Sequence, residues 1–518
     1  MINVKERLEL DKILESIATK AAFSLGKQRV LNSEPSFSSL IVKRDLKRLK
    51  AAMDLSVAFG PLSFGGIKDV SVSLDRASKM AVLSVEELVH IGQFLQGTHR
   101  LRKQYANLEE NYEALDDLFY SLEDAPKLMQ LIDKSFTESF EVLDNASSEL
   151  KEIRRKRARM QSQIEHETAK FLNKHKDMLS EDVVALRQGR QAFLIKPGDK
   201  NKLPGSVLGT SASGQSVYFE PEFLSRLQNE HNQIIAQENE EIERICRVIS
   251  LEVSKVNEQL SANLETSALL DEIFAKALWG VENEGIVANL TKDSLVLENA
   301  RHPLINKDEV VANSYYLQKP HRVILISGPN TGGKSVTLKT IGLFVLLTHT
   351  GCPVLCDKAE VMMVDNVFVD IGDQQSIEKS LSSFSAHLET VSQVIDNATS
   401  NSLILLDELG SQTDPLEGEA LSMAILDHFR KVGSWVVATT HFSKLKKYGT
   451  QFDDILNASV EFNLETLKPT YRYQENVLGE SNALHIAKEY GISQAILDSA
   501  SRYKKESTYE ADNLLEIL

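Results

Sequence analysis

A glycine-rich segment at 323–347, VILISGPNTGGKSVTLKTIGLFVLL, has the residue types of a phosphate-binding loop. Four β-type residues precede the pattern Gly-x4-Gly-Lys-Ser, and a helical pattern follows it directly. Backbone N–H groups in such a loop turn toward phosphate oxygens, and the helix N-terminus adds partial positive charge. Lys334 is expected to reach the β- and γ-phosphates of ATP, and Ser335 to bind Mg²⁺. The expected nucleotide-binding residues here are Gly328, Pro329, Asn330, Thr331, Gly332, Gly333, Lys334, Ser335 and Val336.

Two adjacent acids, Asp407 and Glu408, end an apolar run in SLILLDELGSQTD at 402–414. The run predicts a buried strand that delivers both carboxylates at its carboxyl end. Such a pair would be costly to bury without a metal ion and a water molecule beside it. Asp407 is therefore expected to hold Mg²⁺, and Glu408 to orient and deprotonate the attacking water.

A further strand-like run, WVVATTH at 435–441, ends in His441. A residue at this point of the sheet could sense the γ-phosphate, which would make His441 part of the catalytic set. The alternative is a purely structural histidine.

Serines crowd the start of a predicted helix within DIGDQQSIEKSLSSFSAHLETV at 370–391. Serine-rich helix N-termini bind phosphate well. Because the chain has its own complete phosphate loop, this second site is expected to serve the γ-phosphate of a neighbouring subunit, which predicts a homodimer with two shared sites. A serine-capped helix without a ligand is the alternative. The serines concerned are Ser380, Ser382, Ser383 and Ser385.

The remaining segments must position these residues, and their patterns divide the chain. Residues 298–505 alternate strand and helix, which predicts an α/β P-loop ATPase domain. Residues 1–146 read as a helical core or lever domain. Residues 147–261 carry two helical seams around a glycine-rich, β-rich segment at 180–221, which predicts an antiparallel coiled-coil arm with a small strand-rich head. Residues 262–297 are predicted to return to the helical core and to connect it to the ATPase domain. Residues 506–518 are predicted to form a tail.

The arm is long enough to embrace a nucleic-acid duplex, since thirty helical residues reach about 45 Å. A helical hairpin lying back on its own domain is the alternative. The run KEIRRKRAR at 151–159 has six basic residues in nine, within a protein of formal net charge −16. No aromatic residues interleave with this run, so it indicates recognition by shape and backbone instead of base stacking. A solvated helix face is the alternative. The expected phosphate contacts are Arg154, Arg155, Arg157, Lys196, Lys200 and Lys202.

The composition is that of an ordinary water-soluble protein, with 42% hydrophobic and 25% charged residues. No apolar run approaches 18 residues, and the N-terminus alternates charged and apolar residues, so neither a transmembrane helix nor a signal peptide is expected. Cys246, Cys352 and Cys356 fit buried thiols better than a metal site. We expect a cytoplasmic protein without a membrane partner.

Four motifs together resemble the successive nucleotide motifs of MutS ATPases, in detail those of the second bacterial subfamily, MutS type 2. They are GPNTGGKSVTLKTIGL, DIGDQQSIEKSLSSFSAHL, LLDELGSQTDPLEGEAL and TTHFSKLK. Further resemblances lie in ARHPLI at 300–305, TSASGQSVYFEP at 210–221 and GESNALHIAKEYGI at 479–492. The resemblance implies an ABC-type ATPase domain in a clamp-shaped homodimer whose arms close around nucleic acid. It also implies that Ser382 and Ser383 act in trans and that Gln375 couples the site to the other domains.

The chain departs from the family pattern in three places. It begins at the helical platform without a mismatch-reading domain, so mismatch recognition is not expected. It stops at Leu518, before the C-terminal Smr nuclease-like domain of type 2 proteins, which predicts no nuclease activity from this polypeptide. Gln412 stands where the family usually has glycine, and is expected to slow communication between the two sites.

The resemblance implies a clamp on branched or distorted DNA that restrains recombination. It also implies an alternative, a ribosome-associated ATPase acting on stalled or collided ribosomes and their rRNA. Both functions need the same ATP cycle, so the nucleotide motifs do not separate them.

Overall fold

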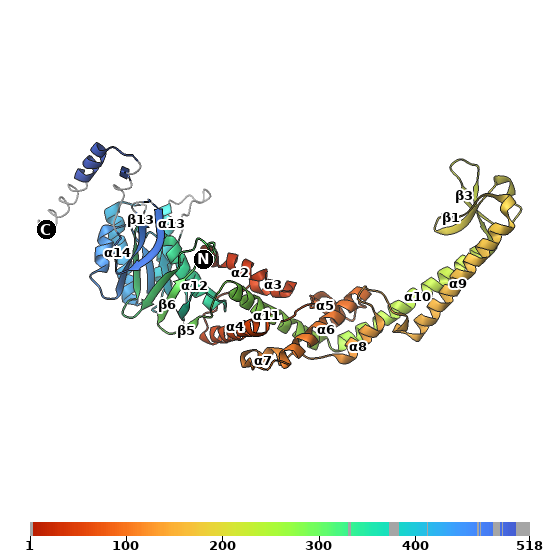
Figure 1. Cartoon of the computed structure of the whole chain (residues 1–518), viewed down its shortest axis with the longest axis horizontal. Helices are drawn as coiled ribbons and strands as arrows, with labels where there is room; N and C mark the ends of the chain where they lie inside the picture. Colours follow the sequence, from red (N-terminus) through yellow and green to blue (C-terminus); the bar gives the residue numbers. More distant parts are fainter. Residues whose placement is uncertain are drawn as a thin grey trace. The chain divides into compact units, whose positions relative to one another are not determined.

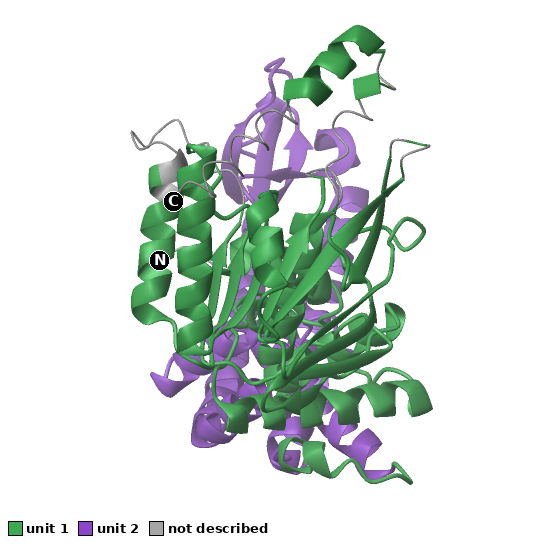
Figure 2. Cartoon of the chain, turned by 90° about the vertical axis from the view of Figure 1, so that its left-hand side faces the viewer, with its two compact units in different colours: residues 1–63, 108–119, 267–518 green, residues 64–107, 120–266 purple. Residues whose placement is uncertain are grey.

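The computed structural model of the chain describes residues 4–329, 333–371, 383–411, 413–463, 466, 468–479, 487–488 and 491–503. The chain forms two compact units, which Figure 2 shows in different colours. Unit 1 comprises residues 1–63, 108–119 and 267–518, and unit 2 comprises residues 64–107 and 120–266. The predicted helical domain over 1–146 is thus shared between the two units. The other predicted boundaries stay predictions.

Unit 1 is built on a six-stranded sheet that holds the predicted phosphate loop and acidic pair. Five neighbouring strands are parallel, and the last is antiparallel at one edge. Parallel strands need long crossovers, and here these are the helices on both faces. In spatial order the strands are β10 (Val367–Asp370), β11 (Leu403–Leu406), β12 (Trp435–Thr439), β8 (Val323–Ser327), β13 (Ile455–Asn463) and β14 (Lys468–Glu475).

Both faces of this sheet are covered, which explains why its strands are apolar throughout (Figure 1). Along β8, Ile324 and Ile326 face the core that contains α12 (Lys334–His349). Val323 and Leu325 face a second core. That second core is completed by α13 (Ser383–Asn397), α14 (Pro415–Val432) and α15 (Ser443–Gly449).

The N-terminal residues belong to the core around α12. Leu8, and the buried face of α2 (Leu10–Ala18), share one apolar cluster with α12 and the sheet. The approach is close at Gly342, where an added Cβ would clash with Leu405 Cδ1 and lie 2.9 Å from Leu8 Cδ1. This packing is the physical reason why the first 63 residues group with the sheet.

Among the described residues, the rest of unit 1 consists of a second sheet and further helices. The sheet has the order β5 (Asn289–Thr291), β9 (Lys358–Met362), β6 (Ser294–Ala300) and β7 (Asn313–Gln318). The helices include α1 (Val4–Arg7), α3 (Ser24–Leu31), α4 (Ser39–Phe59) and most of α7 (Glu113–Tyr120), and residues 494–503 are also helical. Helix α11 (Asn257–Glu282) runs through the boundary between the units.

Unit 2 contains a long helix, four strands and a second long helix in this chain order. Helices α9 (Ser148–Lys174) and α10 (Glu222–Lys255) lie side by side, and the strands follow at their ends (Figure 1). The small sheet has the order β1 (Leu179–Arg187), β2 (Arg190–Ile195), β4 (Val217–Pro221) and β3 (Gly205–Thr210). Phe193 and Phe219 lie fully buried under it. Helices α5 (Ser71–Ser78), α6 (Val85–Ala106) and α8 (Pro126–Ser135) complete the unit.

Two further sequence-based expectations concern thiols and membranes. All three cysteines are buried, as predicted, and burial raises the pKa of Cys352 to about 11 and that of Cys356 to about 12. Across the described ranges, no helix combines the length and apolar character that a bilayer crossing requires.

Truncation of Leu8 tests whether the N-terminal segment is part of the unit 1 core. Leu8→Ala is expected to lower the free energy of unfolding of unit 1 by about 2–5 kcal/mol, because it leaves a cavity against α12. Both tryptophans of the chain, Trp279 and Trp435, are buried in unit 1, so their fluorescence in a denaturant titration reports on that unit. The control is Leu40→Ala, since Leu40 is 82% exposed in the same unit. Equal unfolding midpoints for the two variants would contradict this packing.

Candidate nucleotide-binding site

The predicted site residues meet at one edge of the six-stranded sheet. Gly328 follows β8, Asp407 follows β11, and His441 lies two residues beyond β12, with these three strands adjacent. Ligands of open α/β sheets bind outside the carboxyl ends of the strands. The register therefore brings together side chains from residues 328 to 441 of the sequence.

Lys334 begins α12 with an almost completely buried side chain, 2% exposed. Its Nζ donates a hydrogen bond to the carbonyl of Gly328 at 2.8 Å and lies 3.9 Å from Glu408 Oε1. Burial lowers the pKa of Lys334, and the nearby carboxylates oppose this shift. Gly333 caps the helix at φ +98°, a conformation that favours glycine. Pro329 precedes three predicted phosphate ligands, Asn330, Thr331 and Gly332, which lie outside the described residues.

Asp407 is held between two hydroxyl groups. Ser335 Oγ donates to Asp407 Oδ2 and Thr439 Oγ1 donates to Asp407 Oδ1, each at 2.6 Å. Thr439 Oγ1 in turn accepts the backbone N–H of Glu408 at 2.8 Å. A hydroxyl and a carboxylate in direct contact form an oxygen donor set of the kind that Mg²⁺ prefers. Thr439 was missed from the sequence, where it is only the first threonine of TTH.

Glu408 has a backbone conformation that is uncommon for a residue with a Cβ, at φ +50°. Its N–H donates to Thr439, and its carbonyl accepts the N–H of Ser411 at 3.0 Å. The side chain is 32% exposed, so water can reach it. Residues held in sparsely populated backbone regions cluster at functional sites, and this conformation could not be predicted from the residue types around Glu408.

His441 and Lys446 lie on the segment after β12. The His441 and Phe442 rings have centroids 4.4 Å apart. Burial lowers the pKa of His441, Glu408 opposes the shift, and the Lys334 and Lys446 charges add to it. The neutral imidazole is therefore favoured. Lys446, which was not singled out from the sequence, donates from Nζ to the carbonyl of Gly479 at 2.7 Å, and burial lowers its pKa too.

A second histidine approaches the site from α13. His387 Nδ1 lies 2.9 Å from Asp370 Oδ1, and the carbonyl of Asp370 accepts the N–H of Asp407 at 2.8 Å. His387 was missed, although it stands four residues after Ser383 on the serine-rich helix. Ser383 begins α13. Gln375, Ser380, Ser382 and Gln412 lie outside the described residues, so their predicted roles stay predictions.

A cavity of about 290 Å³ opens beside Gly333, within unit 1. It is partly apolar and carries two tyrosine rings, which suits a flat heterocycle. Val336, predicted to bind the cofactor, is 39% exposed and lines it. The wall also includes His302 from the ARHPLI segment, Val310, Tyr315, Thr340 and Tyr471.

The predicted nucleic-acid contacts in unit 2 differ in whether their side chains are already paired with other groups of the protein. Arg154 Nε and Arg157 Nη1 both bind Glu238 on α10, at 2.9 and 2.7 Å. Burial raises the pKa of Glu238, but the two arginines lower it further, so Glu238 is ionised. Arg154 also binds Asp144. These two side chains thus hold α9 to α10.

The other four predicted contacts are exposed, as Arg157 is, but none of them pairs with α10 in the described part of the chain. Arg155 and Lys200 have exposed side chains and make no hydrogen bond or ion pair with the residues that the structure describes. In the segment between β2 and β3, Lys196 donates to the carbonyl of Asp177 and Lys202 pairs with Asp199, each at 2.7 Å. The six residues therefore form no single cluster, and their role stays a prediction.

Comparison with known proteins identifies the family. Residues 324–508 match the family described as MutS domain V. The chain is 36% identical over 516 residues to Endonuclease MutS2 of Clostridioides difficile (strain 630), an alignment covering 98% of this chain and 65% of that protein. It is 35% identical over 522 residues to Putative endonuclease MutS2 of Bacillus subtilis (strain 168), covering 99% and 66%. The chain belongs to the MutS family, in its type 2 subfamily. It spans about 65% of the length of these MutS2 relatives.

The threonine that holds Asp407 offers a test of the site in this MutS-family chain. Thr439→Val keeps the shape of the side chain but removes both hydrogen bonds, so the Mg²⁺-dependent ATPase rate is expected to fall about 10- to 100-fold. Thr439→Ser retains the hydroxyl and should keep most of the rate. The measurement is kcat at saturating ATP over a Mg²⁺ titration. A valine variant with the wild-type rate and Mg²⁺ midpoint would show that the hydroxyl has no positioning role.

Proposed function

We propose that this chain is an ATPase that hydrolyses ATP to ADP and phosphate. The observation that carries the proposal is the hydrogen-bonded set at the sheet edge, in which Ser335 donates directly to Asp407 and Thr439 links Asp407 to the backbone of Glu408. Membership of the MutS family supports it. The cavity beside Gly333 is of a size to take part of the nucleoside, with Val336 in its wall.

Each residue of the set has a role that its position allows. The loop from Gly328 to Ser335 and the N-terminus of α12 bind the phosphates, with Lys334 supplying the charge. Ser335 and Asp407 would hold Mg²⁺, which neutralises developing negative charge when bound. Glu408 accepts a proton from the attacking water. His441, neutral and two residues beyond β12, donates toward the γ-phosphate oxygens.

The proposed active form is a homodimer. Each subunit supplies one complete phosphate loop, and Ser382 and Ser383 complete the site of the partner. Gln375 connects the site to the rest of the chain. Support comes from the resemblance of these motifs to those of the family, in which two ATPase domains pair.

The proposed target is branched or distorted DNA, on which the dimer acts as an ATP-gated clamp that restrains recombination. The α9–α10 pair with its terminal sheet supplies the arm, and exposed basic side chains such as Arg155 and Lys200 contact phosphates. The relatives are named endonucleases. The expectation that this polypeptide has no nuclease activity stays a prediction.

Removal of the general base tests the catalytic assignment. Glu408→Gln is expected to lower kcat by about 10²- to 10⁴-fold while ATP still binds, because the amide cannot accept the proton. Steady-state phosphate release and nucleotide binding are measured on wild type and variant, alone and with four-way-junction DNA. The wild-type rate should rise with the junction. A wild type no faster than the variant would contradict the ATPase proposal, and a response to collided ribosomes alone would contradict the DNA target.

The arginines of α9 are expected to separate into two classes. Arg155→Glu should weaken junction binding and reduce the slope of log affinity against log salt by about 0.9, the loss of one phosphate contact. Arg154→Ala should instead lower the melting temperature of unit 2 and leave that slope unchanged, since Arg154 is engaged with Glu238 and Asp144. Binding isotherms at several salt concentrations and thermal unfolding monitor the two effects. An unchanged slope for Arg155→Glu would remove this residue from the interface.

A further inference from the structure

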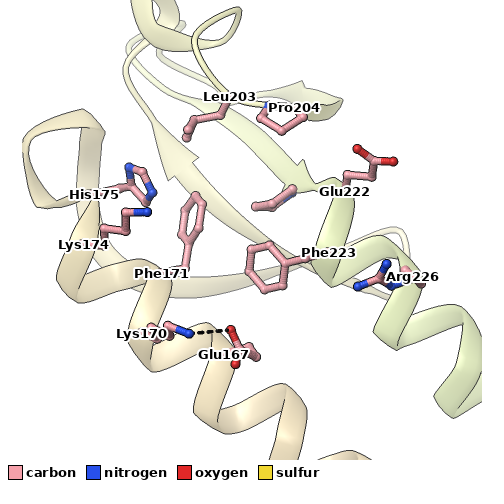
Figure 3. Close-up of a pocket in the computed structure, with 11 residues that line it drawn as sticks. Glu167, Lys170, Phe171, Lys174, His175, Leu203, Pro204, Glu222, Phe223 and Arg226 are labelled. Atoms are coloured by element: carbon pink, nitrogen blue, oxygen red, sulfur yellow. Dashed lines mark ion pairs between the residues drawn. The ribbon is translucent and has the colours of Figure 1, made fainter.

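A second cavity lies in unit 2, where the end of α9 and the start of α10 meet the small sheet (Figure 3). Its volume is about 570 Å³, within the range of about 300–1,000 Å³ that is usual for small-ligand sites. It is lined by Glu167, Lys170, Phe171, Lys174, His175, Leu203, Pro204, Pro221, Glu222, Phe223 and Arg226. The nucleotide site uses none of these residues.

The inner wall of this cavity is aromatic. Phe171 stacks on the buried Phe193 beneath it, with ring centroids 4.4 Å apart and planes 29° apart. The rings of His175 and Phe223 flank Phe171, with centroids 4.7 and 5.6 Å away. Phe223 is only half buried, so its ring is open to the cavity (Figure 3). Leu203 approaches from the strand side, and a flat ligand would contact apolar surface on both faces.

The rim is cationic in an acidic protein. Lys170 is paired with Glu167 at 3.7 Å. Lys174 and Arg226 are exposed and make no ion pair or hydrogen bond with any described residue. They stand on α9 and α10, on either side of the aromatic wall (Figure 3). Glu222 is the remaining carboxylate and can only accept hydrogen bonds, such as those from an exocyclic amino group of a base.

We propose that this cavity binds one unpaired nucleotide of a DNA strand, with the base stacked on Phe223 and its flanking phosphates held by Lys174 and Arg226. Apolar rings between two unpartnered cations suit a ligand that is flat and aromatic in one part and anionic in another. Aromatic side chains in a positively charged groove are the usual means of binding single strands. The proposal rests on DNA being the target, and adds that the target is recognised at an unpaired base as well as by shape.

The test compares three duplexes that differ at one point: fully paired, with a one-adenine bulge, and with the same bulge lacking its base. Wild type should bind the adenine bulge about 5- to 100-fold more tightly than the abasic bulge, the range expected for one stacked base. Phe223→Leu should bind both bulges equally. Arg226→Ala should weaken binding to both bulges and reduce the slope of log affinity against log salt by about one. Because the Arg226 side chain is exposed, this variant is expected to fold as wild type does.

Matched controls come from unit 2. Phe140→Leu removes a phenylalanine that is 42% exposed elsewhere in the unit, and Lys103→Ala removes an exposed charge from α6. Both should behave as wild type.

Equal affinity of wild type for the adenine and abasic bulges would overturn the inference even if ATP hydrolysis is intact. A base preference that depends on Phe223, in a protein that does not hydrolyse ATP, would support the inference while the ATPase proposal falls. A preference found only with RNA duplexes would overturn the assignment to DNA.

Discussion

The burial of α12 is the constraint on which the candidate site depends. This helix is enclosed by the sheet on one side and by the N-terminal residues on the other, and its first residue, Lys334, is almost completely buried. A helix packed on both sides in this way holds the residue that ends the phosphate loop at the carboxyl ends of the strands. The neighbouring strands then set the distances from Ser335 to Asp407 and from Lys334 to Glu408 through their register. The apolar packing beneath the sheet edge thus fixes the positions of the polar side chains that form hydrogen bonds there.

The parts of the site that could be predicted from the sequence are those encoded by one continuous segment. Strand, glycine loop and helix are adjacent in the chain at 323–347, and the acids at 407–408 directly follow their own strand. Thr439 and His387 were missed because their partners, Asp407 and Asp370, lie on other strands. The same holds for the fold: the core residues of β8 were predictable, whereas the packing of Leu8 against Gly342 depends on segments more than 300 residues apart.

Unit 2 shows the limit of sequence-based inference most clearly. The basic run at 151–159 predicts phosphate binding, and this stays a prediction; what the sequence did not indicate is that Arg154 and Arg157 pair with Glu238 on α10. Interleaved aromatic residues were absent from that run. Phe171 and Phe223, 52 residues apart in the chain, nevertheless line one cavity. Charge density along a helix does not reveal which side chains are already neutralised, and that information comes only from the partner helix.

The division of unit 1 between both ends of the chain also has a consequence for biosynthesis. The buried face of α2 meets α3 soon after it is made, but its contacts with α12 can form only on the order of 300 residues later, which takes about 15–60 s at ordinary translation rates. During this interval the whole of unit 2 is made, while Leu8, Leu10, Ile13 and Ile17 still lack their contacts with α12 and the sheet. The nascent chain therefore carries an N-terminal segment whose apolar side chains are incompletely covered until the sheet is made.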